Sequence, residues 1–128
     1  MCIRDRNGAV LAAVALGGAL GSVARYLAAN GLAVWLGRAF PYGTLAVNVV
    51  GSFLMGLALA LLVQRGLLGE PWRAGLMVGV LGGFTTFSAF AGETLLLAQQ
   101  RPAAALLNIG LHLALCLLAV WAGARVAG

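Results

Sequence analysis

The sequence contains no lysine, and only three of its 128 residues are acidic. Charged residues make up 9% of the chain, whereas soluble domains average about a quarter. So few charges cannot cover a globule in water, and the 62% of hydrophobic residues exclude a disordered chain. The eight arginines are scattered singly, which excludes the clustered basic surface of a nucleic-acid-binding protein. The main solvent of this protein is therefore lipid.

Cysteine is also scarce, with one residue at position 2 and one at position 116. Two cysteines are too few for the disulfide framework of a small secreted domain. Cys116 lies in an apolar run that holds no second cysteine, so we expect a free, buried thiol. His112 is the only histidine, and no nucleophile–base pair is evident, so we do not expect an enzyme.

Long apolar runs, in contrast, fill the chain. A membrane-spanning helix needs roughly 20 apolar residues, and four runs of that length follow one another: Gly8 to Leu36, Gly43 to Val63, Trp72 to just before Gln99, and Ala103 to Ala124. We predict an all-α membrane protein with four transmembrane helices in one domain, residues 8–128. The first run is too long for a cleaved signal peptide and is followed by three more spans. Residues 1–7 form an N-terminal flank to which we assign no function.

The arginines define the orientation only weakly. With an even number of spans both termini share a side, which carries Arg65, Arg73 and Arg125 besides the flank, against Arg38 and Arg101 opposite. So small a bias sets a weak topology preference. It is compatible with insertion in both directions, as in an antiparallel dimer, and equally with a single marginal topology.

Small and polar residues recur at helical spacing inside the runs. Glycines four apart favour closely packed helices; they are Gly17 and Gly21, and Gly75, Gly79 and Gly83. Two polar stripes also recur every four residues: Thr44, Asn48 and Ser52 on the second run, and Asn108 and His112 on the fourth. A polar side chain in hydrocarbon needs a partner. Each stripe therefore either bonds helices together or lines a shared polar pathway.

The third run contains the densest pattern, Gly82-Gly83-Phe84-Thr85-Thr86-Phe87-Ser88-Ala89-Phe90. Paired glycines and paired threonines weaken a helix, so we predict that this helix is broken at mid-membrane. A break frees backbone groups, and such breaks commonly form ion sites. Phe87 and Phe90 would share a face, where their positive ring edges could hold a small anion, although core packing is the usual role of such a pair.

Two charged residues lie inside the spans. Glu93 follows Phe90 by one turn, and Arg25 interrupts the first run. An intramembrane carboxylate is expensive and therefore a candidate functional group. Glu93 could pair with Arg25 or could carry a proton, and the sequence leaves both roles open.

Three segments together resemble a known family, the small bacterial fluoride channels called Fluc or CrcB. The resemblance covers the chain after Asn7 and is strongest at three motifs, which occur in family order: Gly17–Tyr26, Tyr42–Phe53 and Gly82–Phe90. It implies an antiparallel, dual-topology homodimer in a prokaryotic plasma membrane. Such a dimer has two pores that export fluoride passively and so lower its toxicity in the cytoplasm.

The resemblance also implies roles for individual residues. The fluoride pathway would comprise Asn48, Thr86, Phe87, Ser88 and Phe90. The polar stripe of the fourth span adds Asn108 and His112 to the pathway that we predict. Backbone carbonyls of Gly82 and Thr85 would hold a structural sodium ion at the dimer interface. Arg25 matches the arginine of the family's first motif, but neither the resemblance nor the residues assign it a role. Two departures, Ala89 in place of the usual Thr and His112 in place of Ser, affect the expected conductance and pH response.

Two other classes remain possible from the residues alone. A small proton-coupled multidrug exporter has this length and can insert both ways, but it needs a carboxylate in the first span, where this chain has only Arg25. Glu93 is the sole intramembrane candidate, on another helix. A structural subunit would use its polar stripes only to bond helices together.

Overall fold

The computed structural model describes residues 3–128, with side chains from Gly8 onward. All of its regular elements are helical: α1 (Ile3–Leu36), α2 (Tyr42–Ala58), η1 (Leu59–Gln64), α3 (Trp72–Ala74), η2 (Gly75–Leu81), α4 (Gly82–Phe84), α5 (Phe87–Gln100) and α6 (Pro102–Ala127). The two η elements are π-helical. Four spans are long and apolar enough to cross a membrane: Gly8–Leu36, Tyr42–Gln64, Trp72–Gln100 and Pro102–Ala127. The chain is thus a multi-pass membrane protein, and the predicted fourfold pattern is confirmed.

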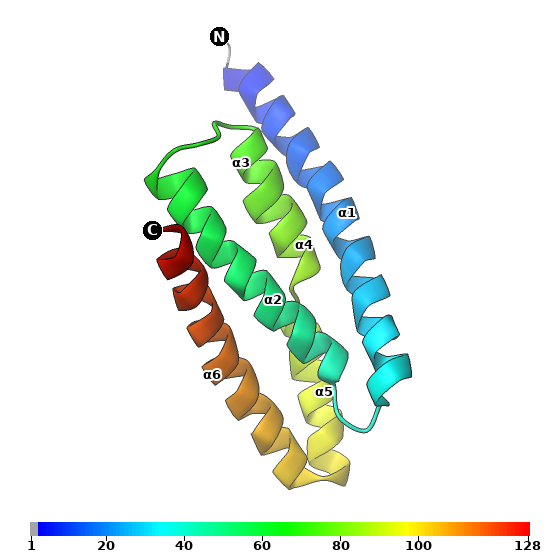
Figure 1. The fold of residues 1–128 in the computed structure, drawn as a ribbon. Coiled ribbons are helices and arrows are strands. Elements are labelled where there is room, and N and C mark those ends of the chain that lie inside the picture. Colours follow the sequence, from blue (N-terminus) through cyan, green and yellow to red (C-terminus); the bar gives the residue numbers. More distant parts are fainter. Residues whose placement is uncertain (1–2) are drawn as a thin grey trace.

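The second and third spans are composite. The second joins α2 to η1 without leaving helical dihedral angles, since Ala58 has φ −63° and ψ −41°. In the third, α3, η2 and α4 continue one another, and then Thr85 (φ −90°, ψ 158°) and Thr86 (φ −151°, ψ 122°) are extended. α5 begins only at Phe87, so the ribbon between α4 and α5 is a short non-helical segment (Figure 1).

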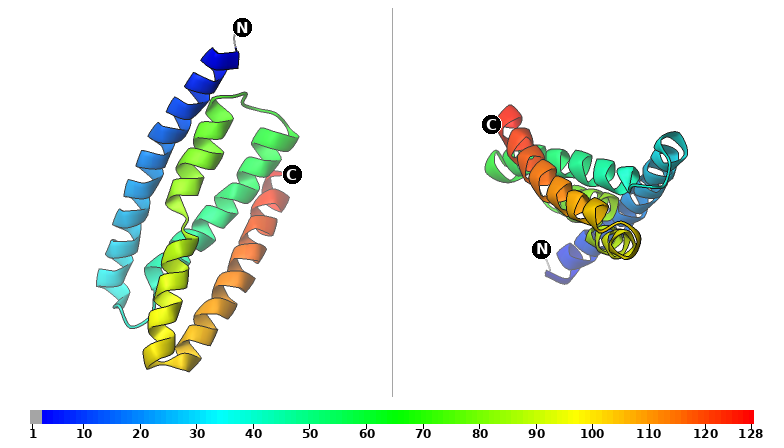
Figure 2. Two further views of the ribbon diagram at one scale, coloured as in Figure 1. Left: turned by 180° about the vertical axis from the view of Figure 1, so that it is seen from behind. Right: turned by 90° about the horizontal axis from the view of Figure 1, so that it is seen from below.

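The helices pack in pairs. α1 lies along η2 and α4, whereas α2 lies along α6, which also contacts α5 (Figure 2). Glycines allow the closest approaches: a Cβ added at Gly79 would lie 2.9 Å from Val14 O, and one at Gly83 would lie 2.8 Å from Gly18 O. The glycine stripes therefore form helix–helix contacts, as their spacing predicts.

The outer faces of the bundle are apolar. The start of α1, the end of α6 and the η1–α3 connection lie at one end of the molecule, as expected for an even number of spans (Figure 1). Trp35, Trp72 and Trp121 are 86%, 70% and 60% exposed near span ends, where amphipathic rings favour a membrane interface. Arg125 lies over the Trp121 ring, 5.6 Å from its centroid.

Candidate functional site

The non-helical segment between α4 and α5 is bonded to the middle of α2. Thr86 N–H donates to Asn48 Oδ1 at 2.8 Å, and Asn48 Nδ2 donates to Thr86 O at 3.0 Å. The backbone amide of Thr86 has no helical partner, because Thr86 is the N-cap of α5, and an unpaired amide is costly away from water. A single buried side chain, 7% exposed, therefore satisfies this amide and also donates to the Thr86 carbonyl.

The threonine side chains complete the segment. Thr85 Oγ1 donates to Leu81 O at 3.0 Å and so binds the end of the preceding turn. Thr86 Oγ1 accepts from Ala89 N–H at 3.2 Å, which caps the N-terminus of α5, and lies 3.3 Å from Ser88 Oγ. Gly51 makes room on α2, because a Cβ there would collide with the Thr85 methyl group.

These contacts also leave two carbonyls without their helical donors. The amide of Thr86, which would bond to Gly82 O in a continuous helix, donates to Asn48 instead. The amide of Ala89, which would bond to Thr85 O, donates to the Thr86 hydroxyl. Carbonyl oxygens are the ligands that hard cations prefer. The donor set at Gly82 and Thr85 therefore fits such an ion.

A cavity of about 330 Å³ opens beside this segment, between α2, α5 and α6. Its polar side chains come from three spans, and its lining comprises Asn48, Gly51, Ser52, Met55, Thr85, Thr86, Phe87, Phe90, His112, Leu113, Cys116 and Leu117. Phe87 and Phe90 meet edge to face, with ring centroids 5.3 Å apart at 63°. Phe90 is 8% exposed, whereas Phe87 is 75% exposed. The cavity thus combines neutral hydrogen-bonding groups with ring edges.

The two residues of the polar stripe on α6 have different surroundings. His112, 5% exposed, lines the cavity with its ring centroid 4.3 Å from that of Phe90. Asn108 is fully buried outside the cavity lining and donates to Thr94 Oγ1 at 2.9 Å, which joins α6 to α5. The contacts of Asn108 are those of an interhelical hydrogen bond, one of the two roles that the stripe left open.

Several residues lie differently from the expectation or were not anticipated. Ser88 is exposed and outside the cavity lining, although it contacts Thr86. Cys116 is free as expected, but it is half-buried and lines the cavity rather than being enclosed in the core. The other cysteine of the sequence, Cys2, lies outside the residues that the structure describes. The sequence could have predicted Met55 and Cys116 as lining residues of the cavity. Met55 lies one helical turn beyond Ser52, and Cys116 lies one turn beyond His112.

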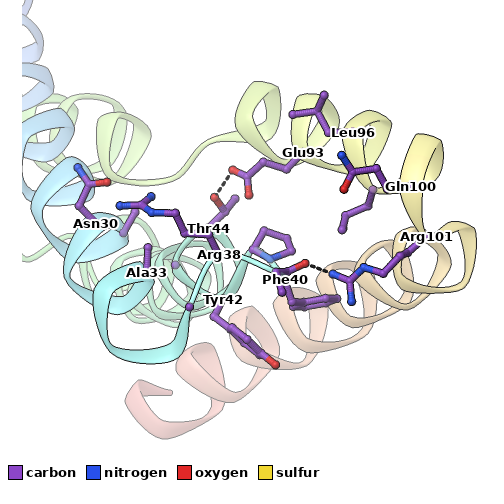
Figure 3. A pocket seen from close by; sticks show the side chains of 16 residues that line it. Asn30, Ala33, Arg38, Phe40, Tyr42, Thr44, Glu93, Leu96, Gln100 and Arg101 are labelled. Carbon is purple, nitrogen blue, oxygen red and sulfur yellow. Dashed lines mark hydrogen bonds between the residues drawn. The ribbon is translucent and has the colours of Figure 1, made fainter.

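A second cavity, of about 540 Å³, opens where the α1–α2 connection meets the end of α5 (Figure 3). Thr44 Oγ1 donates to Glu93 Oε1 at 2.5 Å inside it. Arg38 and Arg101 line its rim, and Arg101 also donates to Ala39 O. Sequence reasoning did not find this cavity, because the flanking arginines lie 63 residues apart in the chain.

Arg25 and Glu93 do not form an ion pair in the described part of the chain. Arg25 Nε donates instead to Gly83 O at 3.1 Å, which bonds α1 to α4. Glu93 accepts from Thr44, on a different helix. Of the two roles considered for Glu93, pairing with Arg25 is not the arrangement seen.

Known proteins resemble this chain over nearly its whole length. The family model described as "CrcB-like protein, Camphor Resistance (CrcB)" matches residues 12–124. The chain belongs to the CrcB-like family. This membership is the one that the three sequence motifs indicated, and the match spans Asn48, the non-helical segment and His112 alike.

Individual CrcB-like relatives have been named for their function. The chain is 52% identical over 118 residues to a protein named fluoride-specific ion channel FluC from Methylococcus capsulatus, covering 91% of this chain and 52% of that protein. It is 52% identical to the protein of the same name from Magnetococcus marinus and 50% identical to that from Geobacter sulfurreducens, covering 93% and 94% of those proteins. The chain thus spans about half of the Methylococcus relative and nearly all of the other two.

Proposed function

We propose that this protein is a fluoride-selective channel that lets fluoride leave the cytoplasm passively through the plasma membrane. The observation that supports this most directly is the Asn48 amide. Its Nδ2 has two hydrogens, of which one donates to Thr86 O. The other has no protein acceptor among residues 8–128, and Asn48 lines the cavity with the two phenylalanines.

The chemistry of the cavity suits a small anion. Fluoride holds its water tightly, so a pore must replace that hydration with donors at close range. In the cavity Asn48 offers an amide hydrogen, Thr86 offers a hydroxyl, and the Phe87 and Phe90 edges offer positive quadrupole ends. Ser88, exposed beside Thr86, offers a second hydroxyl outside the lining. Every one of these groups is neutral, so they stabilise the bound ion without trapping it by a fixed charge.

A second, antiparallel copy would complete the site. Phe87 is 75% exposed and Ser88 is exposed beside it, so one face of the proposed path is open in a single chain. Large apolar side chains are also exposed along every span. The weak arginine bias between the two ends is compatible with opposite insertion of two copies. We therefore assign the fluoride path to the face between two protomers of dual topology.

The carbonyls that fit a hard cation adjoin this path, since Thr85 lines the cavity. Gly82 and Thr85 would hold a sodium ion there through backbone oxygens that lack their helical amide donors. Bound in that position, sodium would supply a fixed positive charge that stabilises the association of the non-helical segments. It is a structural ion in this proposal and is not transported.

The experiment is efflux of fluoride from proteoliposomes, followed with a fluoride-selective electrode. The purified protein is reconstituted alone into vesicles loaded with potassium fluoride, and valinomycin is added to release the compensating potassium. We expect rapid fluoride efflux and no matching efflux from vesicles loaded with potassium chloride. Folded protein that releases chloride but no fluoride would contradict the proposal.

The same preparation separates the alternatives. A proton-coupled exporter would show a proton flux that depends on an organic cation, and it would give no fluoride release of its own. A structural subunit would release no ion at all. The exporter is not favoured, because the intramembrane carboxylate Glu93 is hydrogen-bonded to Thr44 and lines the cavity that lacks Asn48 and the two phenylalanines.

A further inference from the structure

The chain's only histidine is buried against the proposed path. His112 is 5% exposed, its ring lies 4.3 Å from that of Phe90 between centroids, and it lines the same cavity as Asn48 and Thr86. One ring nitrogen, Nε2, is buried and has no hydrogen-bond partner within residues 8–128. A buried polar atom without a partner is costly, so its presence beside the path requires an explanation.

The hydrogen bond at the other ring nitrogen determines what Nε2 can do. His112 Nδ1 lies 3.1 Å from the backbone oxygen of Asn108. A carbonyl oxygen only accepts, so Nδ1 must carry the hydrogen of this bond. A neutral imidazole has just one N–H, and Nε2 is then an acceptor with a lone pair.

The hydrogen bonds around Asn108 likewise determine which atoms of its side-chain amide donate and accept. Thr94 Oγ1 donates to Phe90 O at 2.7 Å, so this hydroxyl can only accept from Asn108 Nδ2 at 2.9 Å. The unpartnered Oδ1 of Asn108 is therefore an acceptor too. Asn108 lies outside the cavity lining, one helical turn from His112, and therefore supplies no donor to Nε2.

A lone pair repels fluoride, whereas a protonated imidazole attracts it. We propose that His112 is a proton-dependent fluoride site: Nε2 takes up a proton, and the resulting N–H donates to the fluoride ion in the cavity. The proton and fluoride enter as separate ions or as hydrogen fluoride, whose H–F bond breaks as the N–H bond forms, so charge and atoms balance. This inference rests on the proposed fluoride channel.

Coupling of this kind is reciprocal. If protonation of His112 strengthens fluoride binding, bound fluoride must favour protonation by the same factor. The titratable groups around His112 are Glu93 on α5, which acts on it electrostatically, and Cys116 on its own helix. α2 presents only neutral side chains to the cavity, and Arg25 of α1 is bonded to Gly83 O. His112 is thus the titratable donor closest to the phenylalanine pair.

Fluoride flux at equal pH on both sides of the vesicle tests the proposal. Between about pH 8 and pH 5, where histidine titrates, we expect flux through the unaltered protein to rise, by up to about tenfold for each pH unit, because the protonated fraction of one group changes by at most that factor. Protein-free vesicles correct for hydrogen fluoride that crosses the lipid. His112→Gln and His112→Ser keep a permanent neutral donor and should conduct without this pH dependence.

The outcomes separate the two proposals. Flux that is independent of pH in the unaltered protein, or that has the same pH profile in His112→Gln, would overturn the role of His112 and leave the channel intact. No fluoride flux at any pH in any of the three proteins would overturn the channel and this inference together.

A spectroscopic measurement covers the case in which the variants do not fold. Because the chain has one histidine, a tag-free sample labelled with nitrogen-15 in histidine gives one pair of imidazole signals. Adding sodium fluoride at constant pH should shift them toward the protonated form, whereas sodium chloride should not. Imidazole signals that respond equally to both salts, or to neither, would contradict a fluoride site at His112.

Discussion

Asn48 and Thr86 exchange two hydrogen bonds across 38 residues of sequence, one from the backbone amide at 2.8 Å and one to the backbone carbonyl at 3.0 Å. One side chain of α2 thereby replaces the helical partner that the Thr86 amide lacks between α4 and α5. The same contact leaves the second amide hydrogen of Asn48 for a ligand. Structure and proposed function therefore depend on the same residue.

Asn48→Asp should abolish fluoride flux. The carboxylate cannot donate to Thr86 O, and it places a negative charge on the path of an anion. The lost hydrogen bond also destabilises the buried site by about 1–3 kcal/mol, and we expect no fluoride efflux above that of protein-free vesicles. Ser52→Ala, also on α2 and in the lining of the cavity, is the matched control and should retain much more flux. Unchanged flux in Asn48→Asp would remove Asn48 from the path.

Phe90→Leu should reduce fluoride flux several-fold while the protein remains folded. Leucine fills similar space but lacks the positive ring edge, and it also loses an aromatic contact worth about 0.5–1.5 kcal/mol. Phe53→Leu makes the same change on α2 outside the cavity lining and should leave flux unchanged. Equal losses in both variants would mean that the rings serve packing alone.

Glu93→Gln should preserve fluoride flux or increase it. The glutamine side chain can still accept from Thr44, and the change removes a negative charge from the cavity at the end of α5. A proton-coupled exporter would lose transport with its only intramembrane carboxylate. Efflux of fluoride, together with proton uptake in the presence of organic cations, should be recorded for both proteins. Loss of all transport in Glu93→Gln would favour the exporter.

Removal of sodium should destabilise the protein. If Gly82 and Thr85 hold a structural sodium ion, dialysis into N-methyl-D-glucamine should lower the melting temperature in detergent, and sodium should restore it. Any ligand that binds only the folded state has this effect. Potassium at the same concentration is the control for ionic strength. Equal melting temperatures in all three solutions would argue against the sodium site.

Gly123→Ala should lower stability, whereas Gly110→Ala on the same helix should not. A Cβ at Gly123 would press on the Phe53 carbonyl and lie 3.0 Å from Leu57 N, but one at Gly110 meets nothing within 4 Å. Overpacking costs about 1–3 kcal/mol, while an unstrained Gly→Ala change gains about 0.4–1 kcal/mol. Thermal unfolding in detergent measures the difference, and similar melting temperatures would contradict close packing of α2 against α6.

Hydropathy predicted the spans well because length and apolar content decide what crosses a membrane. The third run was predicted to begin near Trp72, and α3 begins at that residue. Pro102 is the first residue of α6, a position that proline favours because it has no backbone N–H. The π-helical segments Leu59–Gln64 and Gly75–Leu81 were not predicted. Both are apolar apart from Gln64 at the end of the first, so no periodicity distinguishes their wider turns from α-helix.

The site was predictable in its residue types but not in its bonds. The four-residue spacing placed Asn48 on a polar face, yet nothing local indicates that it bonds to Thr86 rather than to another helix. Asn108 and His112 share a stripe, but only three-dimensional packing buries one against Thr94 and opens the other to the cavity. Long-range partners depend on how helices cross, which one sequence does not specify.

The most direct test of the central claim is the reversal potential of the current in a planar bilayer with fluoride on one side and chloride on the other. A passive, fluoride-selective path predicts a potential set by the fluoride gradient, unmoved by changes in chloride. A pH gradient should change the size of the current but not its reversal. A potential that follows chloride or protons would contradict the account.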